Sequence, residues 1–158
     1  MKRAFIIAAV LSAVLAGCGG GTSPDNGAVV LLQGSHSAGK QQQALDIHDQ
    51  AAFKDMWDKA FAGDSSPPKM PDVDFTKYVV VAFFLGEMKH GGFVIRVDKA
   101  APSDTPGTYD VDWLVISPGA NCVHTTEEVS HPFLIATVPA AGQSISFDVK
   151  NRAEAQCG

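Results

Sequence analysis

The sequence lacks the short motifs that mark common catalytic sites. No serine lies in a G-x-S-x-G elbow, and no H-E-x-x-H pair occurs. The nucleophile turn of a hydrolase and the zinc helix of a metalloprotease are therefore missing. The carboxylates are scattered: Asp72 and Asp74 would point the same way along an extended segment, but they flank the expected start of a strand. These absences predict a protein that is not an enzyme, has no cofactor, and works by recognition.

Positive charge is also scarce. The chain has 12 Lys and Arg against 17 Asp and Glu, a net charge of −5. Two of the basic residues, Lys2 and Arg3, lie at the very start. A mildly acidic surface without a basic stripe argues against nucleic acid as a partner. It also argues against electrostatic adhesion to anionic lipid.

One apparent phosphate-binding motif lacks an essential part. Residues Gly34–Lys40 match G-x-x-x-x-G-K, but Gln41 stands where Ser or Thr must hold magnesium. The residues that follow are rich in Gln and provide no apolar helix start to face the phosphates. We therefore expect a hairpin loop here, joining strands over 28–35 and 40–47.

The N-terminus looks like an export signal. Lys2 and Arg3 precede an apolar stretch, Ala4–Val14, that is too short for a comfortable membrane span. Residues 15–18, Leu-Ala-Gly-Cys, resemble a bacterial lipobox, which implies cleavage before Cys18 and lipid attachment to it. The alternative is an ordinary secretory signal with an incidental cysteine.

Three parts follow from this interpretation. Residues 1–17 are the expected lipoprotein signal peptide, residues 18–27 a flexible tether rich in Gly, Ser and Pro, and residues 28–158 a single domain. Gly19, rather than Asp, follows the cysteine, which resembles the outer-membrane default of Gram-negative lipoproteins. We expect a protein held in the cell envelope by its lipid, in the outer membrane.

Of the three cysteines, two remain once Cys18 is assigned to lipidation. An exported chain with two cysteines most often pairs them, so we expect a disulfide between Cys122 and Cys157. Closing a loop of about 35 residues would stabilise the fold by roughly 3–4 kcal/mol in the chain-entropy model. Two free thiols or metal ligands are the alternative.

Hydrophobic periodicity predicts one helix and about seven short strands. Asp49 can cap a helix whose apolar face carries Phe53 and Trp57 and which Gly63 ends. Besides the two strands of the expected loop at 28–47, runs typical of strands lie at 78–85, 93–97, 109–116, 132–138 and 144–150.

The first two of these runs are the most distinctive. Residues Tyr78–Leu85 are apolar on both faces, while Phe93–Val97 alternate as in a strand with one wet face. We expect residues 72–97 to form a hairpin whose glycine-rich tip is Gly86–Gly92. Because strands and helices do not alternate, a parallel sheet is not expected. The predicted class is α+β: a mostly antiparallel sandwich or barrel with one packed α-helix.

Several of these features together resemble the C-terminal domain of the PrcB family. They are the Trp57 helix, the Val73-Asp74-Phe75 sequence, Gly91-Gly92-Phe93 at the start of a strand, and His131-Pro132-Phe133. The resemblance covers about 51–149. The family is named for an accessory lipoprotein of a bacterial surface protease complex. The resemblance therefore implies an exported, non-enzymatic, β-rich module that binds or stabilises a protease.

The tip of the expected hairpin is the candidate partner-binding turn. The family commonly has Thr and Tyr where this chain has His90 and Phe93. The turn is also similar to the loop that chagasin-type inhibitors present to cysteine proteases, which makes direct protease inhibition an alternative. A purely structural role for the two glycines is a further alternative. The candidate residues are Glu87, Met88, Lys89, His90, Gly91, Gly92 and Phe93.

A metal site is the alternative function of a different class. His124, Glu127, Glu128 and His131 lie within eight residues and would share one face of a helix. Val123 and Val129 give such a helix a poor apolar stripe, and Pro132 would stop it, so a solvated loop is the simpler interpretation. A metal-binding envelope protein stays open as a second hypothesis.

Overall fold

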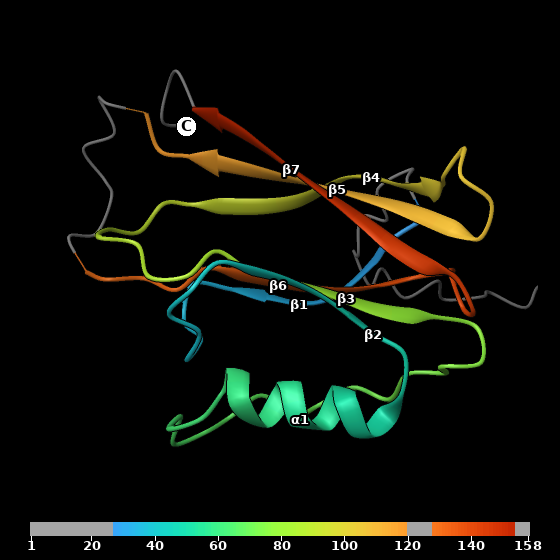
Figure 1. Cartoon of the computed structure of the whole chain (residues 1–158). Helices are drawn as coiled ribbons and strands as arrows, with labels where there is room; N and C mark the ends of the chain where they lie inside the picture. Colours follow the sequence, from blue (N-terminus) through green and yellow to red (C-terminus); the bar gives the residue numbers. More distant parts are fainter. Residues whose placement is uncertain (1–26, 120–127, 154–158) are drawn as a thin grey trace, which may run out of the picture.

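The structure, a computed structural model, describes residues 27–119 and 128–153. These residues form one helix and seven strands in three layers (Figure 1). A three-stranded sheet lies above a four-stranded sheet, and the helix lies beneath. The elements are β1 (Val29–Gly34), β2 (Gln43–Ile47), α1 (Gln50–Ala60), β3 (Val79–Phe84), β4 (Val94–Pro102), β5 (Thr108–Ser117), β6 (Phe133–Val138) and β7 (Ser144–Ala153).

The two sheets differ in their pairing. The four-stranded sheet has the order β1-β6-β3-β2 and is antiparallel throughout. In the other sheet, β4-β5-β7, the β4–β5 pair is antiparallel but β5 and β7 are parallel.

The prediction of about seven strands, mostly antiparallel, with one helix is therefore confirmed. The arrangement is a sandwich and not a closed barrel. Neither sheet is wholly parallel, but the parallel β5–β7 pair was not predicted. The chain leaves β5, passes through β6 in the other sheet, and returns beside β5 in the same direction, so a strand supplies the crossover.

The central strands β3 and β6 are buried along their whole length. Alternate side chains of a strand point to opposite faces, so the four-stranded sheet needs apolar cover on both sides. Val81 and Phe83 face the other sheet, and Ala82 and Phe84 belong to the cluster that the helix covers. This double cover explains why both strands consist almost entirely of apolar residues.

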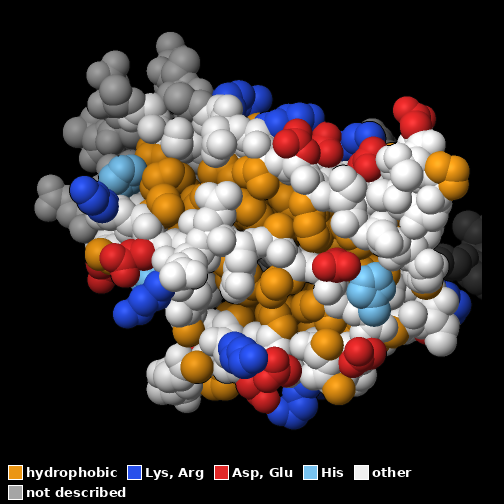
Figure 2. Space-filling view, viewed as in Figure 1, with side chains coloured by type: hydrophobic (Ala, Val, Ile, Leu, Met, Phe, Trp, Pro, Cys, Tyr) orange, Lys and Arg blue, Asp and Glu red, His pale blue; other side chains and the backbone are white. Residues whose placement is uncertain are grey.

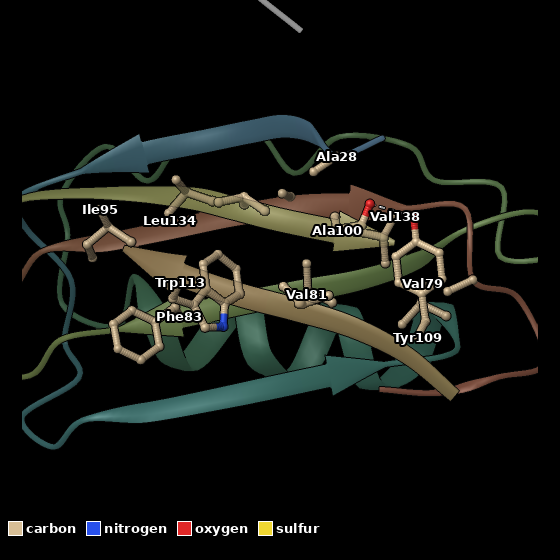
Figure 3. Close-up of a cluster of buried hydrophobic side chains, with 14 of the residues drawn as sticks. Ala28, Val79, Val81, Phe83, Ile95, Ala100, Tyr109, Trp113, Leu134 and Val138 are labelled. Carbon is tan, nitrogen blue, oxygen red and sulfur yellow. Dashed lines mark hydrogen bonds between the residues drawn. The ribbon is translucent and has the colours of Figure 1, made fainter. Parts of the chain in front are cut away.

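Trp113 on β5 lies in the core between the sheets, towards the end that also holds Phe83 (Figure 3). Its ring stacks on Phe83, with 5.5 Å between centroids, and on Phe147 at 6.2 Å. Its indole N–H has no hydrogen-bond partner among the described residues. At the other end of the core the Tyr109 hydroxyl donates to the Ala100 carbonyl at 3.1 Å.

Helix α1 forms where the sequence predicts it. The Asp49 carboxylate accepts a hydrogen bond from the Ala52 backbone N–H at 2.8 Å, which is the expected N-cap. Phe53 and Trp57 are buried against the four-stranded sheet. The Trp57 indole N–H donates to the Pro68 carbonyl at 3.0 Å and so ties the proline-rich connector to the helix. In the part of the chain that the structure describes, no helix has the length and apolar character to cross a membrane.

Both expected hairpins are wrong. Strands β3 and β4 lie in different sheets, so residues 72–97 cross between layers instead of folding back. The double-sided apolar pattern of β3 requires neighbours in the middle layer, whereas the wet face of β4 suits the outer sheet. Strands β1 and β2 lie at opposite edges of their sheet, so the loop between them spans the sheet instead of turning tightly.

Some predicted features lie outside the described residues. These are the signal peptide, the lipidation site Cys18, all of the tether except Gly27, and both residues of the expected disulfide, Cys122 and Cys157. They stay predictions.

A turn stabilised by Asp74 leads into β3 and makes the fold sensitive to acid. The Lys77 ammonium at 2.8 Å and the N–H and O–H of Thr76 lower the pKa of Asp74 from 3.8 to about 2. Because the pKa is lower in the folded state, this stabilisation is complete above about pH 4 and is lost as the pH falls through about 2.

We predict that Asp74→Asn removes this acid-dependent part of the stability. Urea unfolding followed by circular dichroism at a series of pH values measures it. The native protein should be more stable than the variant above pH 4, and the two should converge towards pH 2. A difference that is independent of pH would contradict the role assigned to the carboxylate.

Candidate functional site

The turn at residues 86–93, which contains the candidate residues 87–93, lies at one end of the sandwich and joins the two sheets. Met88 pairs with Ser130 through two backbone hydrogen bonds of 2.8 and 3.0 Å. The Ser130 hydroxyl donates to the His90 carbonyl at 2.8 Å. The backbone of the turn is therefore fixed by the segment that precedes β6.

The loop between β1 and β2 holds the other side of this end. The Glu87 N–H donates to the Lys40 carbonyl at 3.3 Å, and the His131 N–H donates to the Ser35 carbonyl at 2.8 Å. The Ser37 hydroxyl donates to the His131 carbonyl at 3.2 Å. Three segments that are distant in the sequence thus meet here through their backbones.

The side chains of the turn divide between core and solvent. Met88 and Phe93 pack against the core between the sheets, and His90 stacks on Phe93 with 5.2 Å between ring centroids. Glu87 and Lys89 are exposed. The turn therefore presents charged side chains and glycine backbone on an apolar base.

The structure brings the candidate turn beside the candidate metal segment. The Glu87 carboxylate lies 3.7 Å from Nε2 of His131, an ion pair that requires the imidazole to be protonated. Sequence reasoning had treated these two residues as parts of separate sites. His124 and Glu127 lie outside the described residues. Within 27–119 and 128–153 no group of three or more His, Cys, Asp or Glu side chains could hold a metal ion.

Ser130 and the loop at 35–42 were not predicted as parts of this site. Ser130 is almost fully buried, at 3% exposed, yet it lies in a polar stretch with no pattern that would indicate burial. The sequence of this loop resembles an incomplete phosphate-binding motif, and we expected it to be the loop of a hairpin. Their contact with the turn depends on the order of strands in the sheet, which no local signal gives.

Apart from Asp74 and its partner Lys77, the charged groups whose pKa shifts lie away from the turn, on the outer face of the three-stranded sheet. Lys150 lies 2.9 Å from Asp112 and 3.2 Å from Asp98, and these carboxylates raise its pKa. Lys99, at 2.9 Å, lowers the pKa of Asp110. All of these charges are paired across strands on a solvated face, which is a structural arrangement rather than a reactive one.

What the turn can do chemically is limited to contact. Among the described residues it has no nucleophile beside a base and one ionisable pair, Glu87 with His131. A backbone held in place by neighbouring segments loses little conformational freedom on binding. The arrangement therefore suits recognition by shape and main-chain hydrogen bonds.

Gly86 fits this turn closely, so its substitution is a direct test of the packing. Its φ is +85°, and a Cβ there would lie 3.0 Å from backbone atoms of Gln41 and Gln42. We predict that Gly86→Ala destabilises the fold by about 3 kcal/mol, because backbone strain adds to a clash with main chain that cannot yield.

Gly107→Ala is the matched control. Gly107 has a φ of +77° but no atom within 4 Å of the added Cβ, so only the strain of about 1–2 kcal/mol applies. Chemical denaturation of both variants measures the difference. An equal loss of unfolding free energy in the two variants would show that the turn does not pack tightly against the loop at 35–42.

Comparison with known proteins gives one match. Residues 79–139 match the family model described as PrcB C-terminal. No curated protein and no solved structure matches the chain. The matched residues run from β3 through the turn, β4 and β5 to the end of β6. The predicted resemblance to the PrcB family is thus confirmed over residues 79–139.

Proposed function

We propose that this protein is a non-catalytic accessory subunit that binds an exported protease from a lipid anchor in the cell envelope. The observation that carries the proposal is the PrcB C-terminal match over residues 79–139. The match to this family suggests a subunit associated with a protease complex. The lipobox-like sequence ending at Cys18 supports the anchor, and Gly19 after it supports the outer membrane as its location.

The turn at residues 86–93 is the proposed contact with the protease. It lies inside the matched region, and its backbone is held by Ser130 and by Lys40. Glu87 and Lys89 project from it into solvent. A rigid backbone with a few exposed side chains lets a partner gain contact energy without first ordering the loop.

Lipid anchoring at Cys18 predicts how the protein divides between a detergent phase and water. Replacing Cys18 by Ser removes the thiol that would carry the lipid, and with it the acyl chains that would hold the protein in the membrane. In Triton X-114 partition of host cells, the native protein should enter the detergent phase and Cys18→Ser the aqueous phase. Native protein found in the aqueous phase would contradict lipid anchoring.

The turn predicts a charge-sensitive interaction. The tagged full-length protein, crosslinked in its own envelope and purified, should retain a protease that mass spectrometry identifies. Lys89→Glu should reduce that recovery by at least about tenfold, because reversing an exposed charge at an interface sets like charges against the partner. The same substitution at another exposed lysine, Lys69→Glu in the proline-rich connector, should leave recovery unchanged.

Recovery of no protease, or equal loss with both lysine variants, would refute the role of the turn. Where a protease is recovered, its hydrolysis rate with and without the purified protein separates the two modes of action. A maintained or increased rate supports an accessory subunit, and a rate that falls in proportion to added protein supports the inhibitor alternative.

A further inference from the structure

The four edge strands of the two sheets differ in how they are protected against pairing. Edges are commonly blunted by bulges, prolines or charged side chains. β1 has a bulge between Val30 and Leu32, and β4 has one between Val97 and Lys99 and ends at Pro102. β7 carries three charged residues along its length, Asp148, Lys150 and Arg152.

β2 has neither a bulge nor a proline, and its one charged residue is Asp46. Its sequence, Gln-Ala-Leu-Asp-Ile, contains no proline, lysine or arginine, and it pairs with β3 in unbroken register. Among the described residues β3 is its one neighbour in the sheet. Its free edge therefore offers a regular row of backbone donors and acceptors.

A groove runs along β2 on the helix side. It lies between β2 and α1 and has a volume of about 460 Å³. Leu45, Ile47, Met56 and Phe84 contribute apolar lining. Ala52 on α1 also lines it and is exposed, so the helix leaves room for side chains that enter from outside.

The opposite side of β2 is apolar as well. Ala44 on β2 and three residues of β7, Ile145, Phe147 and Val149, are only partly buried against the core between the sheets. Figure 2 shows hydrophobic side chains in two bands, one between the upper sheet and β2 and the other between β2 and the helix. A strand added to β2 would find apolar surface for both of its faces.

Charge around the groove is uneven. Its charged lining residues are Asp46, Asp55 and Lys59. Asp55 and Lys59 form an ion pair at 2.7 Å. Asp46, which lies 2.9 Å from Nε2 of His48, is therefore the lining carboxylate without a lysine or arginine partner among the described residues. Asp46 lies near the end where β2 leads to α1, and His48 and the helix cap Asp49 follow directly. This end of the groove is therefore complementary to a basic side chain.

We propose that the free edge of β2 and its groove bind an extended segment of another protein as a fifth strand of the sheet. The segment is apolar over three to five residues and begins with a basic residue. It runs antiparallel to β2, as every other neighbour in this sheet does, which places its basic start beside Asp46. Main-chain hydrogen bonds provide affinity, and the groove and its carboxylates select the sequence.

This surface shares no residue with the turn at 86–93 and does not depend on the proposed function. The probe is the fluorescein-labelled peptide Lys-Thr-Val-Leu-Val-Thr, titrated with the full-length protein and followed by anisotropy. We expect saturable binding below about 1 mM. The peptide with Pro in place of Leu should bind at least about tenfold more weakly, because it lacks a backbone N–H needed for pairing. Glu in place of the first Lys should also weaken binding.

Two variants of neighbouring helix residues locate the site. Ala52→Arg places a long side chain in the groove and should weaken peptide binding at least about tenfold. Ala51→Arg makes the same change at an exposed position of α1 that does not line the groove, and should bind as the native protein does. Thermal unfolding shows that both variants are folded.

The remaining outcomes overturn the proposal. No saturable binding of any of these peptides, or equal affinity in both variants, would show that the edge does not accept a strand. Sedimentation that gives a dimer dispersed by Ala52→Arg would show that a second copy of this chain occupies the edge instead.

Discussion

Two strands that are apolar on both faces determine the architecture. β3 and β6 bury all their side chains, so the sheet that contains them cannot leave either face in water. The three-stranded sheet covers one face, and α1 with the proline-rich connector covers the other. The connections must then cross between layers, because the covering elements come from both sides of β3 in the sequence. After β3 the chain crosses through the turn at residues 86–93.

The turn at residues 86–93 forms where the chain passes from one sheet to the other, and this explains how its backbone is held. Gly86 allows the chain to leave β3 against the backbone of Gln41 and Gln42. Ser130, which directly precedes the segment leading to β6, fixes the far side of the turn through the His90 carbonyl. A partner that contacts the turn meets a backbone set by the packing of the whole sandwich. Function assigned to this turn is consequently a matter of backbone shape and exposed charge rather than of reactive side chains.

The same architecture leaves β2 as an edge strand without a bulge or a proline. A middle sheet covered on both faces still has two edges, and at β2 the covering elements stand back far enough to leave a groove. The three-stranded sheet differs, because charged side chains cover its outer face. There Lys99 and Lys150 pair with carboxylates on neighbouring strands. The proposed turn contact and the β2 edge would give the protein two separate recognition surfaces.

The sequence by itself determined the local elements, because hydrophobic period and capping act over a few residues. The N-cap at Asp49, the helix beneath Trp57, the buried β3 and the alternating β4 and β5 all follow from it, as does the PrcB resemblance. Tertiary structure alone decided which strands pair. The hairpins predicted at 72–97 and across 28–47 were wrong, and the parallel β5–β7 pair was not predicted, since strand order depends on contacts between distant residues. For the same reason only the fold placed Glu87 beside His131 and left the edge of β2 open along α1.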